Sequence, residues 1–198
     1  RSPSRGLGDV YKRQGFVHAE SNLGKITDVI GIVGGSGRKF GDGPLSELSK
    51  EAWDATLELN LTTAALTAKY ALHHLHEGSV TLTSSVLATS HSPEYFQTAA
   101  YATAKAGIEG LVKFLASTYA ARKIRINAVA PGLTATPMAA RAAGDQRVAS
   151  YAELKQPLVG GFLQPEDLVP AYLYLLEARA VTGEILTVDG GWSSVRNH

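Results

Sequence analysis

The sequence has no cysteine among its 198 residues, so disulfide bonds and thiolate metal sites are excluded. Its 19 basic and 18 acidic residues give a formal net charge of +1, and such a balance does not favour nucleic acid as a partner. No stretch approaches the roughly 18 apolar residues of a membrane span, and no apolar signal-peptide core is present. We therefore expect a cytoplasmic protein whose partners are small molecules or further copies of itself, with no nucleic acid and no membrane.

The first 14 residues, RSPSRGLGDVYKRQ, show neither helical nor strand periodicity. Within them, DVYKRQ at 9–14 resembles an in-frame translation of the transposon end used in sequencing-library preparation. We therefore interpret residues 1–14 as a non-native scar and 15–198 as a single partial domain. Gly6 and Gly8 mimic the start of a dinucleotide-binding turn, but that turn follows a buried strand and nothing apolar precedes Gly6.

The rest of the chain alternates between short apolar segments and longer amphipathic ones. The apolar segments predict strands at 26–35, 79–85, 124–132 and 184–191, with a possible strand end at 15–20. Helical spacing predicts one long helix or two abutting helices over 45–77, opening at Ser46, and further helices over 98–122 and 165–178. Residues 133–163 are rich in breakers and predict an irregular, mobile lid over a site. This order predicts an α/β fold with a parallel sheet wrapped by helices.

Polar residues that follow strands are the first candidates for a site, because ligands bind beyond the carboxyl ends of parallel strands. Ser84 and Ser85 end one strand, and Tyr101 and Lys105, four residues apart, lie on one face of the following helix. A tyrosine has a pKa of about 10, and a nearby ammonium favours its phenolate. Ser85 can then hold a substrate oxygen while Tyr101 gives or takes its proton, which is the other half of a hydride transfer.

Ser85, Tyr101 and Lys105, together with Pro131 and Gly132, resemble the signature of short-chain dehydrogenases/reductases over roughly residues 26–191. The resemblance implies a Rossmann-like parallel sheet with helices on both faces. It also implies an NAD(P)-dependent oxidoreductase that interconverts a hydroxyl and a carbonyl group on a small-molecule alcohol or carbonyl substrate, with NAD or NADP as cofactor. In intact relatives the two long helices pack against a second subunit, so a homodimer or homotetramer is implied for the parent protein.

The resemblance assigns roles position by position. Tyr101 resembles the family's general acid/base, Lys105 its ribose-binding and pKa-lowering lysine, and Ser85 its substrate-polarising serine. Asn60 resembles the asparagine that holds a water for proton relay, and Thr136 the threonine that contacts the nicotinamide carboxamide. The implied cofactor-binding set is Gly34, Gly35, Tyr101, Lys105, Pro131, Gly132 and Thr136.

Two departures from the family pattern leave a second hypothesis open. Ile32, Val33, Gly34 and Gly35 stand where the family usually has Asn-Asn-Ala-Gly. The first βαβ unit, with the glycine-rich turn that binds the cofactor's pyrophosphate, has no counterpart in the sequence. The alternative is therefore a catalytically silent fragment, or a binding or oligomerising module.

Three ambiguities concern the site itself. Tyr151 and Lys155 repeat the Tyr-x-x-x-Lys spacing, but they fall in the predicted lid, so the strand context favours Tyr101. Ser84 competes with Ser85, and since neighbouring side chains of a strand point to opposite faces, only one of them reaches Tyr101. Three histidines near a helix end suggest a metal site, but no cluster elsewhere completes a coordination shell, so we expect no metal; they are His73, His74 and His76.

Overall fold

Four parallel strands form one sheet in the order β1-β2-β3-β4. In this computed structural model, which describes residues 7–139 and 144–194, the strands are β1 (Asp28–Gly31), β2 (Gly78–Thr83), β3 (Ile124–Pro131) and β4 (Ile185–Val188). Val80 of β2 pairs with Val29 on one side and with Ile126 on the other. The two central strands are almost entirely buried, as expected of parallel strands that are covered on both faces.

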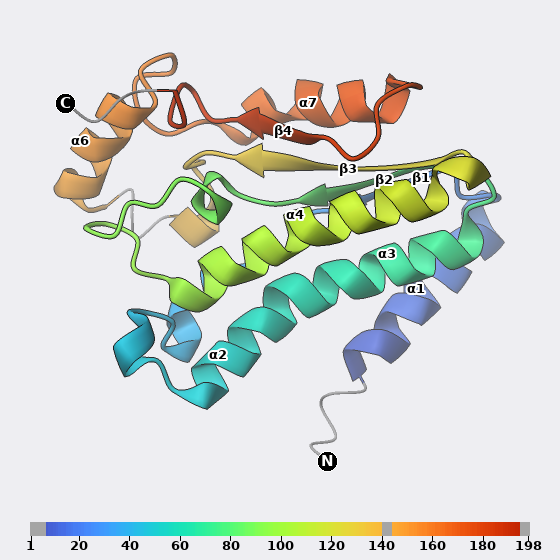
Figure 1. The fold of residues 1–198 in the computed structure, drawn as a ribbon, viewed down its shortest axis with the longest axis horizontal. Helices are drawn as coiled ribbons and strands as arrows, with labels where there is room; N and C mark the ends of the chain where they lie inside the picture. The colour runs from blue at the N-terminus through green and yellow to red at the C-terminus, as the bar shows by residue number, and fades with distance from the viewer. Residues whose placement is uncertain (1–6, 140–143, 195–198) are drawn as a thin grey trace.

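Helices cover both faces of this sheet (Figure 1). On one side lie α1 (Leu7–Leu23), α2 (Lys50–Leu57), α3 (Thr63–His74) and α4 (Ala99–Tyr119), and on the other lies α7 (Pro165–Glu177). The helix α6 (Gln146–Lys155) sits beyond the carboxyl ends of the strands. The predicted Rossmann-like α/β fold, with a parallel sheet between helices, is confirmed.

Two apolar clusters hold the helices to the sheet. The larger cluster packs α3 and α4 against β2 and β3, with Leu72, Ile108 and Val112 among its buried members. The smaller one packs Leu175 of α7 against Val129 of β3. Each fully buried side chain of this kind contributes roughly 1.5–3 kcal/mol. The sheet is therefore fixed from both faces, and its carboxyl edge is a rigid base for a site.

The predicted long helix over 45–77 is one helical run with a wider turn in its middle. It begins at Lys50 because the Ser49 hydroxyl accepts a hydrogen bond from the Ala52 amide at 3.1 Å, so the predicted start at Ser46 is wrong. Between α2 and α3 the residues Glu58–Thr62 form a π-helix, which contains the buried Asn60. Single π turns inside α-helices occur frequently at functional sites.

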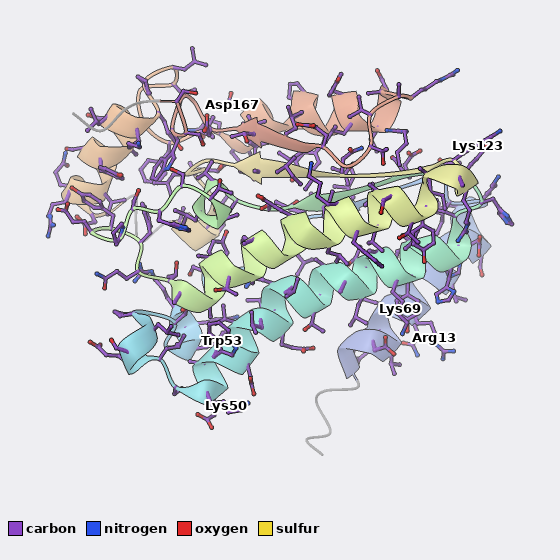
Figure 2. The ribbon with its side chains drawn as sticks, viewed as in Figure 1. Arg13, Lys50, Trp53, Lys69, Lys123 and Asp167 are labelled. Atoms are coloured by element: carbon purple, nitrogen blue, oxygen red, sulfur yellow. The ribbon has the colours of Figure 1, made fainter. Side chains whose placement is uncertain are left out.

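The expectation of a strand end at 15–20 is wrong, because these residues belong to α1. This helix is held on α3 by tertiary contacts: Phe16 stacks on the His74 ring at 5.5 Å, and Glu20 pairs with the same imidazole at 2.8 Å. Lys69 of α3 and Arg13 of α1 lie where the two helices meet (Figure 2). Residues 7–14, for which the sequence shows no helical pattern, are part of the same helix. The division into a scar and a domain stays a prediction, and residues 1–6 lie outside the described part.

Two further predictions need correction. The strand expected over 26–35 is only four residues long, since its pairing with β2 ends at Gly31, and the exposed Ile32 and Val33 follow it at the edge of the sheet. The segment 133–163, expected to be irregular, contains α6. Asp145 starts that helix by accepting a hydrogen bond from the Arg147 amide at 2.9 Å, and its buried face holds it in place.

Candidate active site

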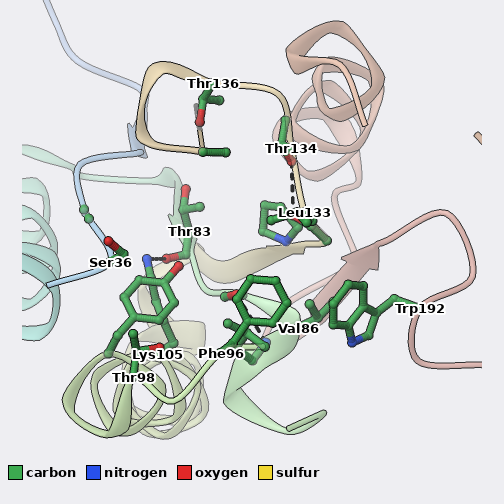
Figure 3. Close-up of a pocket in the computed structure, with 18 of the residues that line it drawn as sticks. Ser36, Thr83, Val86, Phe96, Thr98, Lys105, Leu133, Thr134, Thr136 and Trp192 are labelled. Carbon is green, nitrogen blue, oxygen red and sulfur yellow. Dashed lines mark hydrogen bonds between the residues drawn. The ribbon is translucent and has the colours of Figure 1, made fainter. Parts of the chain in front are cut away.

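A cavity of about 690 Å³ lies at the carboxyl ends of β1, β2 and β3, beside the first turns of α4 (Figure 3). It forms at this edge because the loops that leave parallel strands diverge there. Eight of the nine site residues expected from the sequence line it: Gly34, Gly35, Ser85, Tyr101, Lys105, Pro131, Gly132 and Thr136. The ninth, Asn60, lies directly behind Gly34 and Gly35.

Tyr101 and Lys105 lie one helical turn apart near the beginning of α4. The Lys105 side chain is buried, and its ammonium donates a hydrogen bond to the Thr83 carbonyl at 2.8 Å. The ammonium lies 5.5 Å from the centre of the Tyr101 ring. Burial lowers the pKa of Lys105 to about 8. Near neutrality the cavity thus contains a cation that has lost most of its water.

The direction of the Tyr101 pKa differs from the expectation. Burial raises this pKa, and the neighbouring Ser85 hydroxyl opposes the rise only in part. From the sequence we expect the ammonium of Lys105 to favour the phenolate. In the structure the loss of hydration around the phenol is the larger effect, while the ammonium is directed to the Thr83 carbonyl. Tyr101 is therefore a neutral phenol at pH 7.

The two serines after β2 have different surroundings. The Ser85 side chain lies beside Tyr101, whose pKa it lowers, and its oxygen accepts a hydrogen bond from the Leu87 amide at 3.2 Å. Ser84 faces the other way and donates to the Glu109 carboxylate of α4 at 2.7 Å. This follows from the alternation of side chains along an extended segment. Of the two, Ser85 is the hydroxyl that reaches Tyr101.

Asn60 holds the loop after β1 in place. Its side-chain oxygen accepts from the Gly35 amide at 3.0 Å, and its side-chain nitrogen donates to the Gly35 carbonyl at 2.9 Å. A Cβ at Gly34 would lie only 2.8 Å from the same oxygen and 3.2 Å from the Lys105 nitrogen. Glycine at 34 is thus required by the close approach of two polar side chains.

Residues that the sequence reasoning did not select complete the walls of the cavity. Gln156, which is fully buried, accepts from the Leu133 amide at 2.6 Å and donates to the Leu133 carbonyl at 3.0 Å, which fixes the loop after Gly132. Phe96 and Trp192 pack together at 5.9 Å between ring centres and form an aromatic wall (Figure 3). The only signal for Trp192 in the sequence is its place directly after the Asp-Gly-Gly that follows the last strand.

The second Tyr-x-x-x-Lys pair has a packing role. The Tyr151 ring stacks on Tyr95 at 4.1 Å, and its hydroxyl shares a hydrogen bond of 2.7 Å with Ser92. Lys155 lies 5.9 Å from the Trp192 ring. Both residues thus pack beside aromatic side chains that line the cavity.

The three histidines form no metal site in the described part of the chain, where no group of three or more potential ligands gathers. His74 instead pairs with Glu20 at 2.8 Å. Among the same residues, no helix combines the length and the apolar character that crossing a bilayer demands.

The cavity fits part of a nicotinamide cofactor. The Lys105 ammonium has three donors, and among the described residues only the Thr83 carbonyl accepts from it, so donors remain for ribose hydroxyls. Gly34 and Gly35 leave room for a ligand beside this ammonium, and Thr136 lies across the cavity from it (Figure 3). These residues supply polar contacts for a ribose and an amide.

Comparison with known proteins agrees with this arrangement. A family model described as enoyl-(acyl carrier protein) reductase matches residues 12–193. The chain is 37% identical over 169 residues to a cis-4-hydroxycyclohexanecarboxylate dehydrogenase from Sinomonas cyclohexanicum; the match covers 83% of this chain and 66% of that protein. It is 33% identical over 185 residues to carbonyl reductase family member 4 from Danio rerio, covering 92% and 74% of the two chains. The chain thus spans roughly two thirds to three quarters of these relatives.

The fold also matches a solved structure. A crystal structure described as a putative short-chain dehydrogenase/reductase from Burkholderia xenovorans superimposes with a TM-score of 0.83 at 29% identity. The match covers 96% of this chain and 72% of the other. Sequence and fold therefore agree on the same group of oxidoreductases.

Proposed function

The chain belongs to the short-chain dehydrogenase/reductase family, and on that premise we propose that its cavity interconverts a hydroxyl and a carbonyl group on a small molecule. Proteins of this family use NAD or NADP. The observation that carries the proposal is the meeting of Tyr101 and Ser85 at the cavity wall, where Ser85 acts on the Tyr101 pKa, with the Lys105 ammonium 5.5 Å from the centre of the Tyr101 ring.

Each side chain has a defined part in the proposed reaction. The nicotinamide, when bound, supplies or accepts the hydride. During carbonyl reduction the Ser85 hydroxyl donates a hydrogen bond to the carbonyl oxygen, and Tyr101 transfers its phenolic proton to that oxygen as the new alcohol forms. During alcohol oxidation the proton returns to the Tyr101 phenolate, and Lys105 stabilises that charge while it binds the ribose. Asn60 is assigned to the proton relay, beside Lys105.

The raised pKa of Tyr101 supports reduction at neutral pH. The phenol is the proton donor that reduction needs, and burial keeps it protonated. Oxidation needs the phenolate, so its rate is expected to increase as the pH rises above neutrality.

The aromatic wall indicates the substrate class. Phe96 and Trp192 line the cavity, with Trp192 across it from Ser36 and Lys105 (Figure 3), and Leu87 adds further apolar surface. Apolar walls bind apolar groups through the area that both remove from water. A ketone or secondary alcohol with an apolar ring or chain next to the reacting carbon fits this surface.

Tyr101→Phe tests the proposal directly. The full chain is assayed for NADH and NADPH oxidation with a panel of cyclic ketones, and the variant is expected to lose about 10²–10⁴-fold in turnover, because the proton donor is removed. The matched control is Tyr151→Phe, which removes the same hydroxyl from the second Tyr-x-x-x-Lys pair and is expected to keep the parent's turnover. Full activity in Tyr101→Phe would refute the assigned role.

A further inference from the structure

Asp42 lies buried in the loop between β1 and α2, far from Tyr101 in the sequence. One carboxylate oxygen accepts a hydrogen bond from the Ala100 amide at 3.1 Å, and the other accepts one from the Tyr101 amide at 2.9 Å. Both oxygens thus bind the first turn of α4. One of the two amides belongs to the residue assigned as general acid/base.

The helix itself provides no cap at this end. Thr98 stands at the N-cap position of α4, and its side chain makes no capping hydrogen bond. The first amides of a helix have no partner within it, so a group from elsewhere must satisfy them when they are buried. Asp42 fills this role for two amides, and the neighbouring Gly43 carbonyl accepts from the Ala99 amide at 3.2 Å. Three successive amides of α4 are therefore held by two adjacent residues of one loop.

That loop is rigidly placed. Its turn begins at Gly37, whose φ of 74° suits glycine, and the Asp42 amide donates to the Gly37 carbonyl at 3.2 Å. A Cβ at Gly37 would lie 2.9 Å from that of Asp42 and would also clash with Thr56 of α2. The loop is thus fixed by its packing against α2, and Asp42 holds the first turn of α4 at a fixed place relative to it.

We propose that Asp42 is a positioning residue, which sets the place and rotation of the first turn of α4 and so aims the Tyr101 phenol at Ser85. The inference rests on the proposed function, because it concerns the orientation of its proton donor. Two hydrogen bonds from one carboxylate to consecutive amides fix rotation as well as distance. Catalysis is sensitive to such placement, since a displacement of about 1 Å can cost on the order of 10²-fold in rate.

The experiment compares Asp42→Ala and Asp42→Asn with Ser49→Ala in the full chain. Ser49 caps α2 through the Ala52 amide, so its replacement removes a helix cap that does not hold Tyr101. Turnover is measured as NADPH-dependent reduction of a cyclic ketone. The ionisation of Tyr101 is followed by NMR of ¹³Cζ-labelled tyrosine, with its resonance assigned through Tyr101→Phe.

Asp42→Ala is expected to lower kcat by about 10-fold or more with KM changed less than about twofold, because the proton donor is displaced while the apolar wall stays intact. The Tyr101 resonance is expected to titrate at lower pH than in the parent, since a displaced phenol regains water. Asp42→Asn keeps one acceptor oxygen, so its kcat and its Tyr101 titration are expected to lie between those of the parent and of Asp42→Ala. Ser49→Ala is expected to match the parent in both measurements. If Asp42→Ala fails to fold, the kcat and the Tyr101 titration of Asp42→Asn are compared with those of Ser49→Ala, and this comparison tests the proposal.

Two results would overturn the proposal: a kcat for Asp42→Ala within about twofold of Ser49→Ala, or a Tyr101 titration that both Asp42 variants leave unchanged. A parent chain without turnover in any assay counts against the proposed function. In that case the titration still decides whether Asp42 positions Tyr101, so the two failures are distinguishable.

Discussion

Replacement of Lys105 by methionine is expected to stabilise the protein at pH 7 while it removes activity. The side chain is only 3% exposed, and burial lowers its pKa to about 8 from an ordinary value of 10.5. In the unfolded chain the same ammonium is hydrated and holds its proton more firmly. Folding at pH 7 therefore includes the cost of burying a charge.

The magnitude follows from the shift in pKa. One pKa unit corresponds to about 1.4 kcal/mol, so the buried ammonium costs roughly 3 kcal/mol at pH 7. The unfolded chain binds more protons than the folded one between pH 8 and 10.5, so the parent gains stability as the pH rises through this window. Lys105→Met removes the cost of burying the ammonium, but it also loses the hydrogen bond to the Thr83 carbonyl, which contributes about 1 kcal/mol. A net gain of about 2 kcal/mol at pH 7 results.

Urea denaturation of the parent and the variant at pH 7 and pH 10 measures this difference. At pH 10 most of the gain is expected to vanish, because the parent's Lys105 is neutral in the folded state. Lys113→Met, which alters an exposed lysine of the same helix, is the control, and its effect is expected to be the same at both pH values. The reasoning is wrong if Lys105→Met is less stable than the parent at pH 7, or if its stability difference is equal at both pH values. The parent protein is therefore expected to be less stable than it could be, because its proposed function needs the buried ammonium of Lys105.

Two further pairs of variants separate function from packing. Ser85→Ala is expected to reduce turnover about 10²-fold because it removes the hydrogen bond to the substrate oxygen. Ser84→Ala loses its bonds to the Glu109 carboxylate and the Lys105 carbonyl of α4, and it is expected to keep turnover and lose about 1–2 kcal/mol of stability. Equal turnover in the two variants would contradict the assignment of Ser85 as the serine that binds the substrate oxygen. Gly37→Ala is expected to cost about 3 kcal/mol in urea denaturation, since it combines a positive φ with a clash against α2. Gly160→Ala has a similar φ but nothing within 4 Å, so it is expected to cost about 1 kcal/mol; equal losses would show that the space around Gly37 is not tight.

The central strands and the helix that carries Tyr101 were predictable from the sequence to within a few residues. Val80 and Ile126 lie in apolar segments too short for helices, and breakers bound those segments, so periodicity and length agree. The serines at the end of β2 were placed at the cavity by one rule, that side chains at the carboxyl edge of a parallel sheet meet there. The same rule separated Tyr101 from Tyr151, whose spacing to a lysine is identical.

The errors occurred where tertiary contacts outweigh local pattern. The helix α1 has little amphipathic pattern of its own, and it is held by single contacts such as Phe16 on His74. Local propensity is a weak guide in such a segment. The helix α6 was missed because Gly144 and Pro157 at its flanks suggested a loop throughout, although Asp145 supplies an ordinary cap. The edge strand β1 was predicted too long because its apolar residues continue past the end of its pairing partner.

The cavity loops share a feature that hydrophobic patterns do not reveal. Each is held by one buried polar side chain that binds backbone groups of a distant segment: Asn60 binds Gly35, Gln156 binds Leu133, and Asp42 binds the first turn of α4. Such a residue looks like an ordinary surface position in the sequence, because its partners are backbone atoms and carry no side-chain signature. Yet unpaired backbone groups are costly to bury, so loops that line a cavity need partners of this kind. The side chains that perform the proposed chemistry, and Asn60, were therefore visible in the sequence through the family resemblance, whereas Gln156 and Asp42 became visible only once the chain was folded.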